Sequence, residues 1–109
     1  MPETDYVQVS SAIDSQDGAA QLAKSAVRAR LAACAQVVGP IESTYRWDGE
    51  VTDATEWLVL FKTTAERCEA LIDHLRGSHP YDVPEIIATQ VIGGNPAYLA
   101  WIGQETRPM

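Results

Sequence analysis

Residues 56–63 read EWLVLFKT, and this stretch decides the fold because it alternates like a strand while staying apolar on both faces. Successive side chains of an extended chain point to opposite sides, so Trp57, Val59 and Phe61 share one face and the leucines between them share the other. A sheet containing such a strand must be covered on both sides. At about 25 cal/mol per Å² of apolar surface, leaving one face in water would cost several kcal/mol.

The residues before this stretch predict a long hairpin. One strand is expected from about Cys34, with an interruption at Gly39-Pro40, and it continues to Trp47. Asp48-Gly49 then favours a tight type I′ turn, because both central positions of that turn need a positive φ. The returning strand is expected to end at Lys62.

Two helices and two further strands complete the pattern. Alternation predicts a first strand over residues 6–11, and apolar residues at helical spacing predict a helix over 16–31. A capping box at residues 63–66 opens a second helix, which Gly77 is expected to end. A last strand over 85–92 precedes Asn95-Pro96, which supplies the cap and first position of a short terminal helix.

The order βαββαβ predicts an α+β fold: a ferredoxin-like sandwich with an antiparallel four-stranded sheet and an extra short C-terminal helix. We expect a single domain over residues 5–102 and a C-terminal tail over 103–109. Two helices cover only one face of such a sheet. Because residues 56–63 are apolar on both faces, we expect an obligate oligomer.

Composition and charge exclude some classes of partner. The 109 residues carry a formal net charge of −7, and the sequence pI is about 4.6. Such a chain repels phosphate backbones, so we expect no nucleic-acid partner. No apolar run reaches the length of a membrane span and no signal peptide is evident, so we expect no membrane partner and a cytoplasmic protein. Cys34 and Cys68 are expected to be reduced thiols.

The richest local chemistry lies in HPYDVPEI, residues 79–86. His79 and Glu85 are candidate ligands of a divalent metal ion, copper or zinc, because imidazole and carboxylate suit both ions. The alternative is structural: the imidazole caps the preceding helix or bonds a nearby carbonyl group. Glu85 either faces solvent or pairs with a cation such as Lys62 at a ligand pocket. No catalytic motif is present, so we expect no enzyme and no organic cofactor.

Several separated motifs, in this order, resemble those of the CutA divalent-cation tolerance proteins. They are LAAC (31–34), S-x-Y-x-W-x-G (43–49), Glu56 leading to Lys62-Thr63, HPYDVPEI (79–86) and NPAYLAW (95–101). The resemblance spans roughly residues 6–102. It implies a homotrimer similar in architecture to PII signalling proteins, with copper or another divalent metal bound at clefts between subunits.

The resemblance also implies which residues line such a cleft: Trp47, Lys62, His79, Tyr81 and Glu85. One departure concerns the metal, because Ser10 and Ser11 stand where some relatives carry a cysteine, and a hydroxyl is a far poorer copper ligand than a thiolate. The alternative function is a PII-like signalling or structural module. In that case Lys62 would help bind an anionic metabolite, or the trimer would bind an unidentified partner protein.

Overall fold

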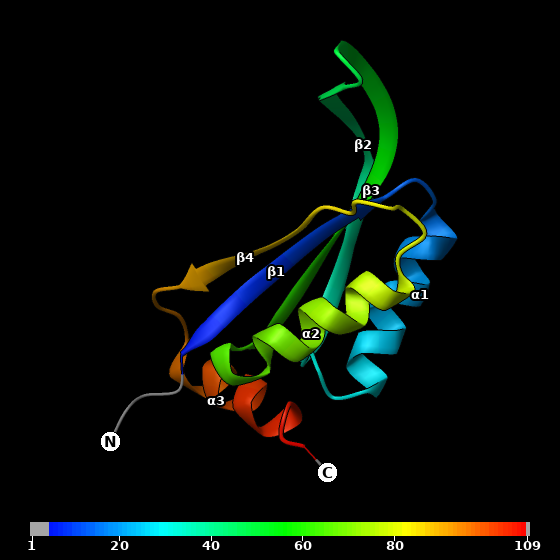
Figure 1. The fold of residues 1–109 in the computed structure, drawn as a ribbon. Coiled ribbons are helices and arrows are strands. Elements are labelled where there is room, and N and C mark those ends of the chain that lie inside the picture. The colour runs from blue at the N-terminus through cyan, green and yellow to red at the C-terminus, as the bar shows by residue number, and fades with distance from the viewer. Residues whose placement is uncertain (1–4, 109) are drawn as a thin grey trace.

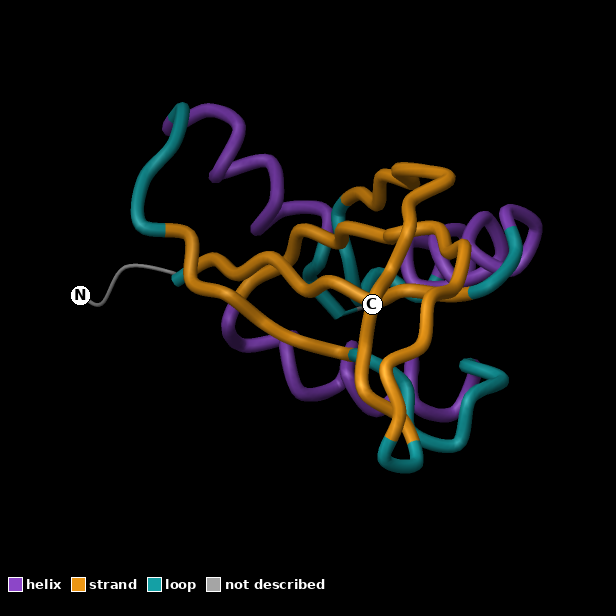
Figure 2. The backbone as a smooth tube through the Cα atoms, turned by 90° about the horizontal axis from the view of Figure 1, so that it is seen from above, coloured by secondary structure: helices purple, strands orange, loops and turns teal. Residues whose placement is uncertain are grey.

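The computed structural model describes residues 5–108 and forms an antiparallel sheet with helices on both sides (Figures 1 and 2). Its strand order is β2-β3-β1-β4. The elements, in chain order, are β1 (Tyr6–Ile13), α1 (Gln16–Arg28), β2 (Cys34–Trp47), β3 (Glu50–Thr64), α2 (Ala65–Ser78), β4 (Ile86–Val91) and α3 (Pro96–Glu105). The predicted α+β class, the four-stranded antiparallel sheet and the extra terminal helix are confirmed.

The core lies between the sheet and the two helices α1 and α2. Val59 and Phe61 of β3 are fully buried there, and Trp57 packs against the same cluster. The remaining members come from β1, from α1 with the segment after it, and from α2: Val9, Ile13, Ala19, Leu22, Ala26, Leu31, Ala32, Leu71 and Leu75. This confirms the predicted inward face of residues 56–63.

The opposite face of the sheet, which we call the open face, carries Leu58 and Leu60 of β3. Val38, which lies across from Leu58, and Ile87, which lies beyond Leu60 on β4, are both exposed. Helix α3 lies on this side, opposite α2 (Figure 2), and the Tyr98 hydroxyl of α3 lies 3.4 Å from the Cys34 sulfur. Since Cys34 is the first residue of β2, this contact places α3 at one end of the open face, while Leu58 and Leu60 are half-buried.

Strands β2 and β3 continue past the sheet as a curved hairpin, which extends the molecule to 49 Å in its longest dimension (Figure 1). Its turn residues Asp48 and Gly49 have φ values of 52° and 80°, as a type I′ turn requires. The register of β2 on β3 shifts between Val38 and Ile41, where the sequence predicted the interruption. The hairpin therefore leaves the sheet at this irregularity.

Several boundaries differ from the prediction: β1 continues to Ile13, β3 continues to Thr64, β4 is one residue shorter at each end, and all three helix ends move. Helix α1 ends at Arg28 rather than Leu31, because Arg30 takes a left-handed φ of 60° and the Leu31 amide bonds back to the Ala26 carbonyl. Helix α2 passes through Gly77 to Ser78, and the extended His79 before Pro80 ends it. Helix α3 continues to Glu105, so the expected tail over 103–109 begins as helix.

No helix among residues 5–108 is both long enough and apolar enough to cross a bilayer.

Gly39 allows the hairpin to leave the sheet over Trp57. A Cβ atom at Gly39 would lie 2.5 Å from Cδ1 and 2.8 Å from Cγ of the Trp57 ring, which packs against the core. We therefore expect Gly39→Ala to lower the free energy of unfolding by about 1–3 kcal/mol. The control is Gly77→Ala in α2, where a Cβ meets nothing within 4 Å and should add about 0.5–1 kcal/mol of stability. Urea denaturation of both variants checks this, and a Gly39→Ala protein as stable as the parent would contradict it.

Candidate functional site

The loop His79–Glu85, which connects α2 to β4, is fixed to β1 at its first residue. His79 is buried; its backbone amide donates to the Leu75 carbonyl and ends α2. Its ring nitrogen Nε2 lies 2.8 Å from the Ala12 carbonyl oxygen, and Nδ1 accepts a 3.2 Å bond from the Tyr81 amide. Because a carbonyl oxygen only accepts, Nε2 carries the proton in this arrangement. The imidazole thus ties the loop to β1.

These bonds bear on the predicted metal ligands. A metal ion on His79 would have to replace one of its two bonds to the backbone. Among residues 5–108, no three His, Cys, Asp or Glu side chains come together in a group that could hold a metal ion. His79 and Glu85 therefore lack, within one chain, the further ligands that copper or zinc would need.

The loop is also fixed at its far end. The buried Ser11 hydroxyl donates a 2.7 Å hydrogen bond to the Glu85 carbonyl oxygen. Ser11, at the position noted for a cysteine in some relatives, is therefore committed to the backbone of the loop. The Glu85 side chain is exposed, and no ion pair with Lys62 is formed.

In the middle of the loop, Tyr81 joins it to the base of the hairpin. Its hydroxyl donates a 2.9 Å hydrogen bond to Oε2 of Glu56 on β3, and its ring lies edge-on to His79 with centroids 4.6 Å apart. Burial, the hydrogen bond to Glu56 and the charge of that carboxylate together raise the pKa of Tyr81 well above its ordinary value. Tyr81 therefore keeps its proton and acts as a fixed donor rather than as a base.

The loop and the hairpin enclose a cleft of about 650 Å³, which we call the hairpin cleft. It is lined by Ala12, Ser43, Thr44, Tyr45, Trp47, Glu56, Tyr81, Asp82, Val83 and Glu85. Three of the predicted site residues, Trp47, Tyr81 and Glu85, are thus brought together, although they lie far apart in sequence.

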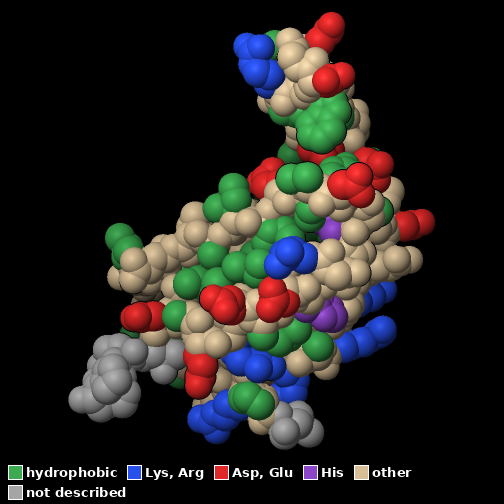
Figure 3. All heavy atoms as spheres, in the orientation of Figure 1, with side chains coloured by type: hydrophobic (Ala, Val, Ile, Leu, Met, Phe, Trp, Pro, Cys, Tyr) green, Lys and Arg blue, Asp and Glu red, His purple; other side chains and the backbone are tan. Residues whose placement is uncertain are grey.

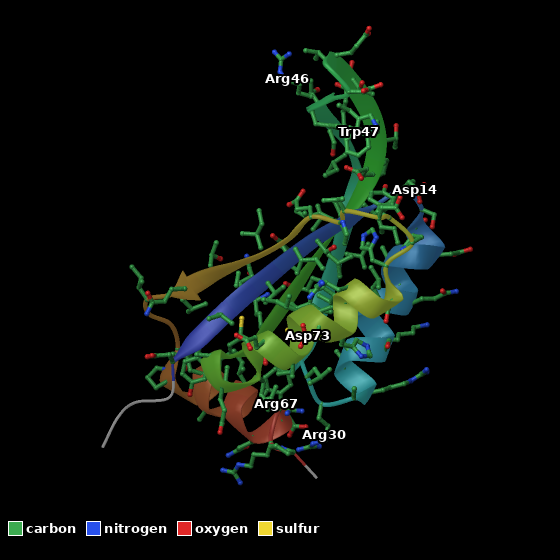
Figure 4. The ribbon with its side chains drawn as sticks, viewed as in Figure 1. Asp14, Arg30, Arg46, Trp47, Arg67 and Asp73 are labelled. Atoms are coloured by element: carbon green, nitrogen blue, oxygen red, sulfur yellow. The ribbon has the colours of Figure 1, made fainter. Side chains whose placement is uncertain are left out.

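The lining of the hairpin cleft is acidic and aromatic. It includes three carboxylates and three aromatic rings but no Lys or Arg. On the face shown in Figure 3, Asp and Glu side chains gather around the base of the hairpin. Arg46 lies near the hairpin tip and extends away from Trp47 (Figure 4), as expected for neighbours on a strand. The cleft therefore favours a positively charged occupant over an anion.

Lys62 does not join the other predicted site residues within one chain. It lies six residues along β3 from Glu56, roughly 20 Å at the rise of an extended strand. Its ammonium donates a 2.6 Å hydrogen bond to Oε1 of Gln36 on β2. Within one chain Lys62 therefore lies apart from Trp47, Tyr81 and Glu85, and the predicted cleft shared between subunits stays a prediction.

Sequence reasoning did not single out Glu56 as a site residue, although Glu56 is the buried carboxylate of the cleft. The available signal was its position at the start of the apolar stretch 56–63, where a charged side chain is out of place unless something binds it.

Comparison with known proteins agrees with the sequence motifs. The family model described as "CutA1 divalent ion tolerance protein" matches residues 7–105. The chain is 42% identical over 94 residues to the divalent-cation tolerance protein CutA of Thermus thermophilus, covering 86% of this chain and 91% of that protein. It is 40% identical to the chloroplastic protein CutA of Arabidopsis thaliana over 87% of this chain, and spans only 52% of that longer relative.

Solved structures show the same fold. CutA from Xylella fastidiosa superimposes with a TM-score of 0.92 at 38% identity, covering 95% of this chain and 100% of that one. CutA1 from Oryza sativa also gives a TM-score of 0.92 at 38% identity, over 95% of each chain. The family model covers nearly all of the residues that form the sheet, the hairpin and the cleft. The chain therefore belongs to the CutA1 divalent ion tolerance family.

Proposed function

We propose that this protein is a non-enzymatic homotrimer of the divalent-cation tolerance type that binds a cation in the hairpin cleft. The observation that carries the proposal is the lining of the cleft, which has Glu56, Asp82 and Glu85 but no Lys or Arg. The family description names tolerance of divalent ions and no reaction. The raised pKa of Tyr81 also argues against a general base at this position.

The homotrimer is supported by the open face. Leu58 and Leu60 are half-buried on it, and Val38 and Ile87 beside them are exposed. Isolated exposed apolar residues are ordinary, but several apolar side chains on one face of a sheet favour an interface, even beside the polar Ser10 and Gln36. Three copies that bury these faces together would remove this surface from water. The cysteines Cys34 and Cys68 are free in the structure, in keeping with the reducing cytoplasm that we propose as its location.

The metal-ligating atoms that line the cleft determine which metal ions it would favour. Carboxylate and hydroxyl oxygens line it, and these are hard ligands that suit ions such as magnesium or manganese better than copper. One chain does not supply a copper or zinc centre, since both His79 nitrogens are bonded to the backbone. Copper or zinc binding through His79 and Glu85 would need donors from a second subunit and a displaced backbone contact.

The PII-like alternative requires an anion site, and the cleft does not favour one. Lys62, the cation assigned to that role, lies on the open face and bonds Gln36. The carboxylates of the hairpin cleft would repel an anionic metabolite.

Calorimetric titration with manganese, zinc and copper salts tests the metal half of the proposal. If one of these divalent ions binds, we expect Glu56→Gln to lower the affinity for it by at least about tenfold. The reason is that this change removes a negative charge from the cleft and keeps the shape of the side chain nearly constant. The matched control is Glu50→Gln, an exposed carboxylate on the same strand outside the cleft, which should bind as the parent does. Binding that survives Glu56→Gln but is lost in Lys62→Ala would contradict the proposed site.

A further inference from the structure

Glu56 is a buried carboxylate without a cation. Only 9% of its surface is exposed, and among residues 5–108 its carboxylate accepts one hydrogen bond, from the Tyr81 hydroxyl. Among residues 5–108 the one ion pair is Arg76–Asp73, on the surface of α2, so no basic side chain in this part of the chain pairs with Glu56. Buried charges in proteins are normally paired or bind an ion, because desolvation without a partner is costly. Since Glu56 also lines the cleft, its missing partner is expected there.

Aromatic side chains line the same cleft as this carboxylate. Within one chain Trp47 is 62% exposed and Tyr45 is 42% exposed, so both rings can be reached by a ligand in the cleft. Tyr81, the third aromatic residue of the lining, donates its hydroxyl proton to Glu56. Aromatic rings attract cations that lie over their faces within about 6 Å, and Trp does so most strongly.

The size of the cleft favours an organic cation over a bare metal ion. Its volume of about 650 Å³ lies in the range of pockets that hold small organic molecules. A bare metal ion would leave most of this space to water, and the described residues provide no group of three metal-ligating side chains. Open space beside aromatic rings suits a ligand with an apolar body.

We infer that the hairpin cleft binds an organic cation, an amine or quaternary ammonium group on an apolar body, with its charge at Glu56 and its body against Trp47. This inference rests on the proposed cation binding and specifies the class of cation. Tyr81 acts as a positioning residue in this site, because its hydrogen bond holds the Glu56 carboxylate at the wall of the cleft.

Tetramethylammonium chloride tests the inference, with tert-butanol as an uncharged molecule of nearly the same shape. The readout is the indole N–H resonance of Trp47 in a ¹H–¹⁵N spectrum, assigned with Trp47→Phe and recorded at constant ionic strength. We expect tetramethylammonium to shift this resonance with half-saturation at roughly millimolar concentration, since so small a ligand makes few contacts. We expect tert-butanol to leave it in place at the same concentrations.

Two carboxylate variants and one tyrosine variant define the site. Glu56→Gln should weaken tetramethylammonium binding at least tenfold, whereas Glu50→Gln should leave it unchanged. Tyr81→Phe keeps the ring and removes the hydrogen bond to Glu56, and it should weaken tetramethylammonium without creating a response to tert-butanol. The spectrum of Glu56→Gln shows whether this variant is folded. If it is not, the test uses the weaker tetramethylammonium binding of Tyr81→Phe and the competition of added salt with tetramethylammonium in the parent protein.

The outcomes separate this inference from the proposed function. Equal shifts by tetramethylammonium and tert-butanol would overturn it, because the cleft would then recognise only apolar shape. If manganese or zinc binds through Glu56 while tetramethylammonium leaves Trp47 unmoved, the organic cation is excluded and the proposed cation binding stands. If no cation responds to Glu56→Gln, both are overturned.

Discussion

Leu60→Asp is expected to convert the proposed trimer into single chains. Leu60 is half-buried on the open face, between Ser10 on β1 and Gln36 on β2. Each copy would lose about 1.5–3 kcal/mol of apolar burial, and the assembly would also have to bury three carboxylates that have no partner. Light scattering coupled to gel filtration should find the parent at about 36 kDa, three times the 11.9 kDa chain, and the variant near 11.9 kDa.

The matched control for this change is Ala70→Asp, which places the same charge on an exposed position of α2 in the helical layer. We expect it to keep the mass of the parent. Circular dichroism of both variants distinguishes dissociation from unfolding. A folded Leu60→Asp protein that keeps the mass of the parent would show that the open face is not the interface.

Phe61→Ala is expected to have the largest effect on stability. Phe61 is fully buried between the sheet and helices α1 and α2, so its removal deletes a large part of the core and leaves a cavity. Such changes cost about 3–5 kcal/mol in the free energy of unfolding. Chemical denaturation at equal protein concentrations measures the loss, because an oligomer gains apparent stability as its concentration rises.

Val51→Ala on the same strand is the control, since 66% of Val51 is exposed on the hairpin. It should change the free energy of unfolding by no more than about 0.5 kcal/mol. A loss below about 1 kcal/mol in Phe61→Ala would mean that residues 56–63 do not form the core as described.

The features that sequence alone predicted are those that depend on neighbours in the chain. The alternation of residues 56–63 predicted that Val59 and Phe61 would be buried together, and the structure confirms it. Asp48-Gly49 predicted a turn with two positive φ values, and both are present. Local preferences of this kind are encoded within a few residues, so they can be read without knowing the fold.

The features that sequence did not predict depend on contacts across the chain. Glu56 becomes a buried cleft residue because Tyr81, 25 positions later, reaches its carboxylate. For His79 the sequence left open a metal ligand or a bond to a nearby carbonyl group; the bond is present, and its partner, the Ala12 carbonyl, lies 67 positions earlier. Lys62 matched the same set of motifs and yet lies along β3 away from the cleft. Motifs identified residues that belong to the family pattern without showing which of them share one site.

The residues that line the hairpin cleft bear on which class of cation we propose for it. A site built on His79 would favour soft or borderline metals, whereas a cleft built on Glu56 and aromatic rings favours cations that carry an apolar surface. The two loop anchors, His79 to Ala12 and Ser11 to Glu85, then serve to hold Tyr81 over Glu56. The histidine contributes to the site through the shape of the loop.

The most direct test of this account is a crystal structure of the protein grown with benzyltrimethylammonium, an ammonium group carried on an aromatic body. We expect the ammonium group beside the Glu56 carboxylate and the Trp47 ring within about 6 Å of the positive charge. A hairpin cleft filled by side chains of a neighbouring copy, with the cation absent from it, would contradict the account.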